Sequence, residues 1–292
     1  MAGLTEHATR LGLGLRGWRS RHVPTSAGAV HLLEAAGAGV LPTMVFLHGF
    51  TSAGCHYGPL LERFRSAAGL VVAPDLPAHG FSDVPPQLDP DALYQGLREA
   101  LDATVVEPAV FVGNSMGGAV ALRYALDRPE RVRGLALIAP GGAPMTPAEL
   151  AGLKRLFEVR SRADALAFVD RVMVRPGAMR QVYAAGIHAG FRRPAMRELL
   201  AAITPEHAVT AAELRGLRVP TRVLWGAEER VFPASGRAFF EAHLPPHGRV
   251  EVVRGIGHCA HLDDCDRTAR VVLRWTEEFA RLGRGTALTD VP

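Results

Sequence analysis

Short apolar runs recur along the chain, and most of them are continuous rather than alternating. Six end in or near glycine, proline or aspartate: TMVFLHG (43–49), GLVVAPD (69–75), AVFVGNS (109–115), RGLALIAP (133–140), VPTRVLWG (219–226) and GRVEVVRG (248–255). Continuous runs of this length are typical of parallel strands that are buried on both faces. The run AVHLLEA (29–35) alternates apolar and polar positions better, which predicts an antiparallel strand near an edge.

Helical patterns separate these runs. Apolar residues recur at helical spacing in the segments 57–67, 90–104, 116–127, 235–243 and 263–281. Strands that alternate with helices along a chain imply a parallel sheet with helices on both faces. The sequence therefore predicts an α/β fold whose sheet is mostly parallel.

The alternation is interrupted once, between the runs 133–140 and 219–226. The segment between them contains no strand-like run, and four helical patterns punctuated by Pro176, Gly177 and Pro194 fill it. We expect residues 142–215 to form a helical cap, inserted into a core made of residues 1–141 and 216–292. A helical insertion between two strands is a candidate lid over a site.

One strand-like run leads directly into a serine that is flanked by glycines. Gly113-Asn114-Ser115-Met116-Gly117 lies between the run 109–115 and the helical segment 116–127, which is the G-x-S-x-G arrangement. A serine on so sharp a turn has a strained backbone, and side chains two residues away on either side would collide. The pattern is common by chance in glycine-rich chains. The strand before it and the helix after it favour Ser115 as a nucleophile over a plain strand-to-helix turn.

A serine hydroxyl is a poor nucleophile unless a base takes its proton. His258 follows the last strand-like run and precedes the last helical segment, a position where loops gather above a parallel sheet. We therefore expect His258 to be this base. His261 is expected in the start of the helix, and Asp263 and Asp264 at its cap and first turn.

The tetrahedral intermediate of such a reaction also needs hydrogen-bond donors for its oxyanion. The turn HGF after the run 43–49 could present the backbone N–H of Phe50, and Met116 offers a second N–H at a helix start. His48 is expected to brace the turn.

Taken together, these motifs resemble the α/β-hydrolase family. The likeness covers residues 28–281, and it is carried by the order of strand, H-G-x turn, elbow serine, acid and histidine. The loop DLPAHGFSD (75–83) is similar to the family's usual loop after the next strand. The segment 113–142 resembles the branch that includes carbon–carbon bond hydrolases of aromatic ring-cleavage products, and related esterases.

The resemblance also implies an acid that orients the histidine. In the family this acid, usually aspartate, lies three residues after the glycine of a "W-G" strand end, and here that position is Glu229. Glutamate can serve in this triad. Glu228 remains an alternative, because the longer side chain allows a shifted register, and a site without an acid remains a third.

Two departures from the carbon–carbon hydrolase pattern favour a carboxylic ester hydrolase. The oxyanion loop reads HGFTSAG instead of being richer in glycine, and Cys259 stands where that branch has tryptophan. The alternatives are a carbon–carbon bond hydrolase of the ring-cleavage type and a binding protein that kept the fold but lost activity. The last is supported only by the unusual glutamate.

Apolar residues of the insertion and the residue before the serine are candidates for a substrate pocket, although each such side chain is more often part of a core. These candidates are Asn114, Phe157, Phe168, Met173, Tyr183, Phe191 and Met196.

The charge of the chain is unevenly placed. Residues 145–216 hold 11 Lys and Arg against 7 Asp and Glu, so the whole formal net charge of +4 lies in this segment. The excess is scattered, unlike the clustered stripe of a nucleic-acid-binding protein, and solvated arginines explain it most simply. If it has a function, it favours substrates that carry a carboxylate.

Composition excludes several other classes of protein. The 292 residues are 48% hydrophobic and 21% charged, as in globular proteins, and no apolar run approaches the roughly 18 residues that span a bilayer. The first 22 residues lack a signal-peptide pattern, and three cysteines at no zinc-ligand spacing fit a reducing compartment. We expect a cytoplasmic enzyme with a small-molecule substrate, no cofactor and no metal.

Overall fold

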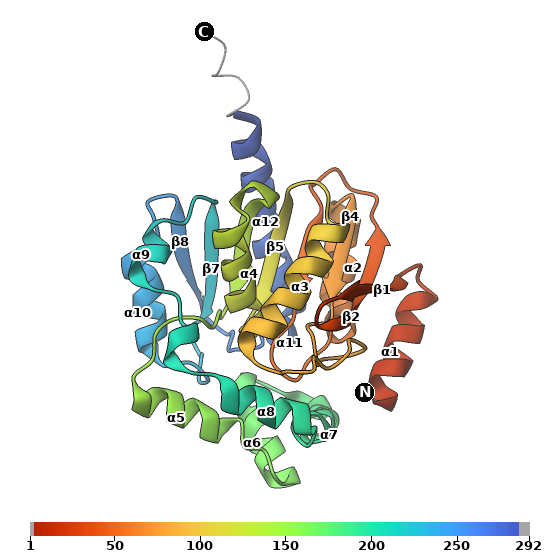
Figure 1. Ribbon diagram of the computed structural model, residues 1–292, viewed down its shortest axis with the longest axis vertical. Helices are drawn as coiled ribbons and strands as arrows, with labels where there is room; N and C mark the ends of the chain where they lie inside the picture. The colour runs from red at the N-terminus through yellow and green to blue at the C-terminus, as the bar shows by residue number, and fades with distance from the viewer. Residues whose placement is uncertain (1–2, 286–292) are drawn as a thin grey trace.

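The computed structural model describes residues 3–285. Within this range eight strands form one sheet in the order β1-β2-β4-β3-β5-β6-β7-β8, and helices cover both of its faces (Figure 1). The pairings β1–β2 and β2–β4 are antiparallel, and every pairing from β4 to β8 is parallel. The strands are β1 (Arg19–Thr25), β2 (Gly28–Ala36), β3 (Met44–Leu47), β4 (Leu70–Pro74), β5 (Ala109–Asn114), β6 (Val132–Ile138), β7 (Thr221–Gly226) and β8 (Gly248–Val253).

The predicted fold class is confirmed: the sheet is mostly parallel, with helices on both faces. Each of the seven expected runs contains a strand, and the run 29–35 is the antiparallel β2 near the edge. The edge strand β1 was not expected, because Val23 is its only buried residue and it therefore carries no apolar pattern.

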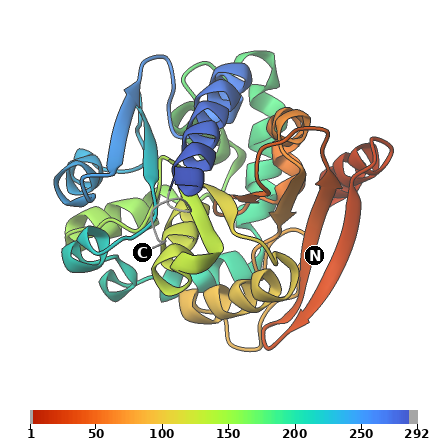
Figure 2. The same ribbon diagram turned by 90° about the horizontal axis from the view of Figure 1, so that it is seen from above.

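The helices form one layer on each side of the sheet (Figure 2). One layer contains α2 and α12, and the other contains α3, α4 and α10. The bounds of the helices are α1 (Leu4–Gly14), α2 (Gly58–Ala67), α3 (Pro90–Thr104), α4 (Met116–Asp127), α5 (Pro147–Leu156), α6 (Arg162–Val172), α7 (Arg180–Phe191), α8 (Pro194–Ala202), α9 (Ala211–Arg215), α10 (Ala234–His243), α11 (Ala260–Asp263) and α12 (Cys265–Gly285).

The strand β5 shows why the central runs are continuously apolar. Its side chains alternate between the two layers: Val110 and Val112 pack with α2 and α12, whereas Phe111 packs with α3 and α4. All six of its residues are buried. A strand buried on both faces has no solvent-facing side, so its residues are apolar except for the buried Asn114 at its end.

Between β6 and β7 the chain leaves the sheet, and residues 142–215 are called the insertion here. Its helices α5 to α8 coincide with the four helical patterns of the sequence and lie together beyond one end of the sheet (Figure 1). The short helix α9 instead lies beside α10 (Figure 1), and its Leu214 belongs to the core of the α/β layers. Within residues 3–285, no helix is both long and apolar enough to cross a membrane.

Candidate active site

Ser115 lies at the junction of β5 and α4, with a backbone conformation that serine rarely adopts. Its φ and ψ angles are 56° and −119°, so φ lies in the left-handed region. The carbonyl of Ile138 accepts the Ser115 N–H at 3.1 Å, and the Ser115 carbonyl accepts N–H groups of Gly118, Ala119 and Gly141. These four hydrogen bonds hold the turn in place.

Two glycines make this turn possible. A Cβ at Gly113 would lie 2.4 Å from the Gly117 carbonyl oxygen, and one at Gly117 would lie 2.1 Å from the Leu47 carbonyl oxygen. Both distances are shorter than any real contact, and the atoms that they meet are backbone atoms. The collision expected from the G-x-S-x-G spacing is therefore present, and it also involves the neighbouring strand β3.

The predicted nucleophile, base and acid lie in one hydrogen-bonded row. His258, in the loop between β8 and α11, has its Nε2 2.8 Å from Ser115 Oγ. Its Nδ1 lies 2.9 Å from Glu229 Oε2, in the loop after β7. Because a carboxylate only accepts, Nδ1 carries the proton and Nε2 is free to accept from the serine.

The Glu229 carboxylate is buried, and both of its oxygens accept hydrogen bonds. Its Oε1 accepts the backbone N–H groups of Val231, at 2.6 Å, and of Phe232, at 3.1 Å. Burial alone would raise its pKa, but the His258 imidazole and these hydrogen bonds outweigh burial and hold the pKa below its usual value. Glu229 is therefore ionised at neutral pH, with one oxygen fixed by backbone and the other on the histidine.

Glu228 faces another way. Its Oε2 accepts the backbone N–H groups of Gly255, at 2.8 Å, and Ile256, at 3.1 Å, and it makes no contact with the imidazole. It thus ties the end of β7 to the start of the loop that carries His258. Of the two adjacent acids, only Glu229 lies at the histidine.

The two predicted oxyanion donors lie beside Ser115. A Cβ at Gly49 would lie 3.3 Å from Ser115 Cβ, so the turn before Phe50 contacts the serine, and Phe50, Ser115 and Met116 line the same cavity. Within residues 3–285, neither the Phe50 N–H nor the Met116 N–H has a hydrogen-bond acceptor. His48 braces the turn: its Nδ1 donates to the Gly49 carbonyl and its Nε2 accepts the Leu76 N–H.

Asn114 was expected in the substrate pocket, and the structure places it underneath the site instead. Its Nδ2 donates to the carbonyls of Ile138, at 3.0 Å, and His258, at 3.2 Å. Its Oδ1 accepts the Tyr57 hydroxyl at 2.9 Å. The side chain therefore joins the histidine loop to β6 and to the segment before α2.

The insertion is bonded to both loops of the site. The Val172 carbonyl accepts the Cys259 N–H at 2.9 Å, and Arg230 donates to the Met173 carbonyl at 2.6 Å. Asp263 accepts the N–H of Val174 at 2.7 Å and that of Gly257 at 2.8 Å. Asp263 was expected to cap the following helix, but Asp264 accepts the Arg267 N–H there.

A cavity of about 520 Å³ opens beside Ser115, between the insertion and the core. Of the predicted pocket residues, only Phe157 lines it. Phe168 and Phe191 pack against Phe157 with ring centroids 5.3 and 5.7 Å apart, and they form the insertion's own core together with Met173 and Tyr183. These four side chains, like Asn114 and Met196, do not line the cavity, which corrects the pocket prediction.

Other apolar side chains line the cavity instead. They include Met145, Leu150, Leu153, Leu199, Leu200, Ile203, Val209 and Phe232. Phe232 also packs edge-on against the His258 ring, with centroids 5.2 Å apart. The i, i+3 spacing of Leu150 and Leu153 could have indicated one apolar face of α5, but not which way that face points.

Comparisons with known proteins bear on the family and the fold of this chain. Residues 44–271 match the sequence profile described as the Alpha/beta hydrolase family. The chain is 32% identical over 251 residues to a pimeloyl-[acyl-carrier protein] methyl ester esterase of Xanthomonas axonopodis pv. citri, covering 80% of this chain and 94% of that protein. It is 31% identical over 219 residues to a 2-hydroxymuconate semialdehyde hydrolase of a Pseudomonas species, covering 69% and 74%. Among solved structures, naproxen esterase from Bacillus subtilis is similar in fold, with a TM-score of 0.76, 19% identity, and coverage of 94% and 97%.

The close approach of Gly117 to β3 generates a stability prediction. Gly117→Ala should lower the free energy of unfolding by about 3 kcal/mol, because the new methyl group meets backbone that cannot move aside. Gly186→Ala is the matched control, since Gly186 lies inside α7 and a Cβ there would meet nothing within 4 Å. The control should gain roughly 0.5 to 1 kcal/mol from helix propensity. Urea unfolding of both variants measures the difference, and equal stability of the two would contradict the packing described.

Proposed function

The chain belongs to the alpha/beta hydrolase family, and within that family we propose that it is a serine hydrolase that cleaves a small, partly apolar carboxylic ester through an acyl-enzyme. The observation that carries this proposal is the continuous row from Ser115 through His258 to Glu229, with distances of 2.8 and 2.9 Å. Such a row supplies a nucleophile, a base and a group that fixes the tautomer of the base.

The proposed reaction begins with attack of Ser115 Oγ on the ester carbonyl carbon, while His258 Nε2 takes the hydroxyl proton. The carbonyl oxygen becomes an oxyanion and accepts the free N–H groups of Phe50 and Met116. The tetrahedral intermediate then expels the alcohol, which takes the proton from Nε2, and the acyl group stays on the serine. Water repeats the sequence with His258 as base and releases the carboxylic acid.

Glu229 acts in this scheme without exchanging a proton. Its lowered pKa keeps it ionised, so it can stabilise the imidazolium that forms when His258 accepts the serine proton. The two backbone N–H groups on its other oxygen hold the carboxylate in position. Because Glu229 contacts the histidine, the unusual glutamate no longer favours a binding protein that has lost activity.

The cavity beside Ser115 supports the proposed substrate class. Its volume and its leucine-rich lining suit a small ester with an apolar part, held by one or two polar contacts. We further propose that the insertion acts as a lid over this cavity. Cytoplasmic location stays a prediction from the sequence.

A carbon–carbon bond hydrolase is the second candidate, favoured by the similarity to the 2-hydroxymuconate semialdehyde hydrolase. The departures at the HGFTSAG loop and at Cys259 count against it. The row of Ser115, His258 and Glu229 by itself serves either reaction, so only a comparison of substrates distinguishes the two candidates.

A direct comparison of substrates separates the two candidates. Short p-nitrophenyl esters should be hydrolysed with a kcat/KM at least about 10²-fold above that for a coloured ring-cleavage dienoate, because differences of this size follow from a few kcal/mol of transition-state contacts. Absorbance assays of both substrates with one preparation measure the ratio. Preference for the dienoate would replace the ester proposal with the second candidate.

Removal of the nucleophile tests the acyl-enzyme. Ser115→Ala should leave the fold intact and lower kcat for a p-nitrophenyl ester by about 10³-fold or more, since only the oxyanion donors and binding remain. A fluorophosphonate probe should label the wild-type protein and not the variant. More than about a tenth of wild-type activity in the variant would overturn the assignment of Ser115.

The two glutamates offer a matched pair of variants. Glu229→Gln should lower kcat by roughly 10² to 10⁴-fold, because the amide can present an N–H to the imidazole and favour the wrong tautomer. Glu228→Gln should change kcat by less than about threefold, since an amide oxygen can still accept the N–H groups of Gly255 and Ile256.

The third variant, Glu229→Asp, restores the usual family residue and should give partial activity. Its carboxylate falls short of the imidazole, because the loop is closed around the longer side chain through Val231 and Phe232. Measuring all three variants with one ester decides the assignment. A large loss in the Glu228 variant with little loss in the Glu229 variant would transfer the role to Glu228.

A further inference from the structure

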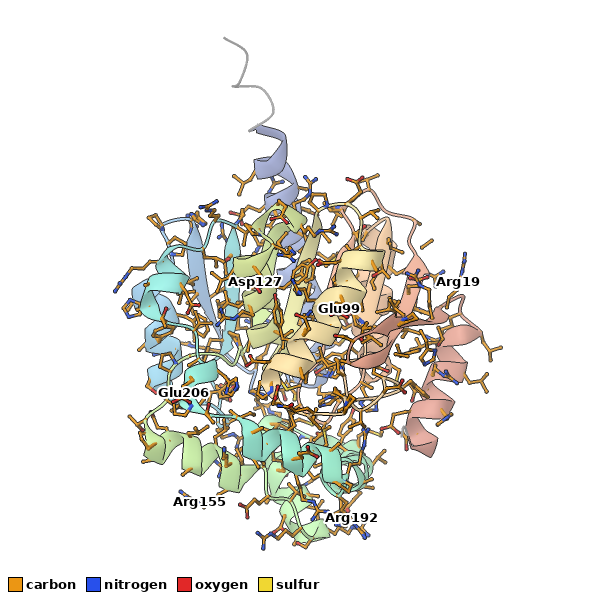
Figure 3. The ribbon with its side chains drawn as sticks, viewed as in Figure 1. Arg19, Glu99, Asp127, Arg155, Arg192 and Glu206 are labelled. Atoms are coloured by element: carbon orange, nitrogen blue, oxygen red, sulfur yellow. The ribbon has the colours of Figure 1, made fainter. Side chains whose placement is uncertain are left out.

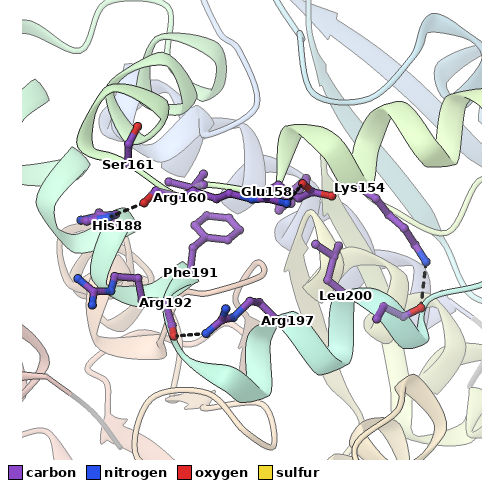
Figure 4. Close-up of a pocket in the computed structure, with 12 residues that line it drawn as sticks. Lys154, Glu158, Arg160, Ser161, His188, Phe191, Arg192, Arg197 and Leu200 are labelled. Atoms are coloured by element: carbon purple, nitrogen blue, oxygen red, sulfur yellow. Dashed lines mark hydrogen bonds and ion pairs between the residues drawn. The ribbon is translucent and has the colours of Figure 1, made fainter.

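The insertion contains a second cavity that is separate from the one beside Ser115. Its volume is about 1050 Å³, and its walls come from α5, α7, α8 and the loop between α5 and α6 (Figure 4). Ser115 and His258 do not line it. Because it lies within the insertion alone, we call it the insertion cavity.

The rim of the insertion cavity is strongly cationic. Lys154, Arg160, Arg192 and Arg197 line it, against the single carboxylate of Glu158. Four of the eleven basic residues of the segment 145–216 thus face one cavity. These four side chains are scattered along the sequence but line the same cavity in space.

Most of this charge is uncompensated. Glu158 pairs with Arg160 at 2.7 Å. Within residues 3–285, no carboxylate lies at ion-pair distance from Lys154, Arg192 or Arg197; Lys154 and Arg197 donate only to the backbone carbonyls of Ala201 and Arg192. Arg192 and Arg197 are neighbours, whereas Lys154 lies at the opposite end of the cavity (Figure 4). The two guanidinium groups repel one another, and an anion bound between them would remove that repulsion.

The floor of the cavity is apolar. Phe157, Val159 and Phe191 are buried side chains of the insertion's core, and the Phe191 ring lies between the basic side chains in Figure 4. Phe157 and Leu200 line this cavity and also the cavity beside Ser115. These two side chains are therefore the partition between the two spaces.

The polar end of the cavity beside Ser115 has the opposite charge. Asp91, Asp127 and Glu206 line it, against Arg123, which is paired with Glu213. Figure 3 places Asp127 over the α/β layers and Glu206 near their junction with the insertion, whereas Arg192 lies on the insertion's far side. An anion is thus disfavoured at this end of the cavity beside Ser115 and favoured in the insertion cavity.

We propose that the insertion cavity is a binding site for a small amphiphilic anion, namely a carboxylate or phosphate attached to an aryl or acyl group. The charged group is held by Arg192 and Arg197, and the apolar group lies on Phe157 and Phe191 (Figure 4). The site does not depend on the chemistry at Ser115, so it stands whether or not the proposed ester hydrolysis is correct.

Calorimetric titration of the 292-residue chain with octanoate tests this site. Octanoate should bind, its affinity should fall as salt is raised, and octanol of the same chain length should bind at least about tenfold more weakly. Octyl phosphate and inorganic phosphate complete the series and distinguish the two kinds of anion. Both octyl anions should bind more tightly than inorganic phosphate, because only they cover the apolar floor.

A pair of double variants locates the binding. Arg192→Gln with Arg197→Gln should weaken octanoate binding by at least about tenfold, since both exposed cations face the cavity. Arg162→Gln with Arg175→Gln removes the same charge from exposed arginines of the insertion that do not line the cavity, and it should leave the affinity within about twofold.

Three outcomes would overturn the proposal. Equal weakening by both double variants would mean that only net charge matters. Equal binding of octanoate and octanol would mean that the cations do not recognise the ligand, and no binding of octanoate would mean that the rim is merely solvated. Loss of activity in Ser115→Ala is a separate result, so failure of the proposed function and failure of this site are told apart.

Discussion

The arrangement of the site depends on the close contact between the turn at Ser115 and the neighbouring strand β3. Gly117 approaches the Leu47 carbonyl so closely that no side chain fits, which brings the start of α4 against the end of β3. The same contact places the Met116 N–H and the turn that carries Phe50 on one side of the serine. Left-handed backbone at a non-glycine residue costs on the order of 1 to 3 kcal/mol. The hydrogen bonds of Ser115 to Ile138, Gly118, Ala119 and Gly141 offset that cost.

The loop that carries His258 is positioned relative to the Ser115 turn by hydrogen bonds to its backbone. Asn114 holds the carbonyl of His258, and Glu228 holds the start of the same loop at Gly255 and Ile256. The imidazole is then fixed at both nitrogens, by Ser115 and by Glu229. The side chains of Asn114, Ser115 and His258 are buried, where an unpaired polar group is costly, so this part of the loop has few alternative conformations.

The sequence predicts the layers of the fold well, because burial on both faces produces a local signal. The run 109–115 reads as a strand since every residue of β5 is covered, whereas β1 gives no signal because it is exposed. The positions of Ser115 and His258 also follow from local order along the chain. The assignment of Glu229 as the acid required the family resemblance, since spacing alone does not tell which of two adjacent acids faces the imidazole.

The pocket could not be predicted, because it depends on how helices of the insertion turn against one another. Phe168 and Phe191 are as apolar as Leu150 and Leu199. Yet Phe168 and Phe191 belong to the insertion's core, whereas Leu150 and Leu199 line the cavity beside Ser115. A helical pattern shows that one face is buried but not which neighbour buries it. The gathering of Arg192 and Arg197 with Lys154 has the same origin, since α5 and the α7–α8 corner meet only in three dimensions.

The contacts between the insertion and the site restrict how the insertion could move. Residues 172–174 are bonded to Cys259, Arg230 and Asp263, which lie in or next to the loops that carry His258 and Glu229. Displacing this segment would leave buried groups unpaired and would disturb the imidazole, because Asp263 also holds the N–H of Gly257. Helices α5 and α8, which line the cavity beside Ser115 through Leu150 and Leu199, have no such bonds to the two loops among the described residues. They are bonded to the core elsewhere: Glu149 of α5 accepts the Ser235 hydroxyl, and Arg193, the residue before α8, donates to the Ala78 carbonyl. If the proposed lid opens over Ser115, these two contacts must break, whereas the end of α6 can stay bonded to the loops of the site.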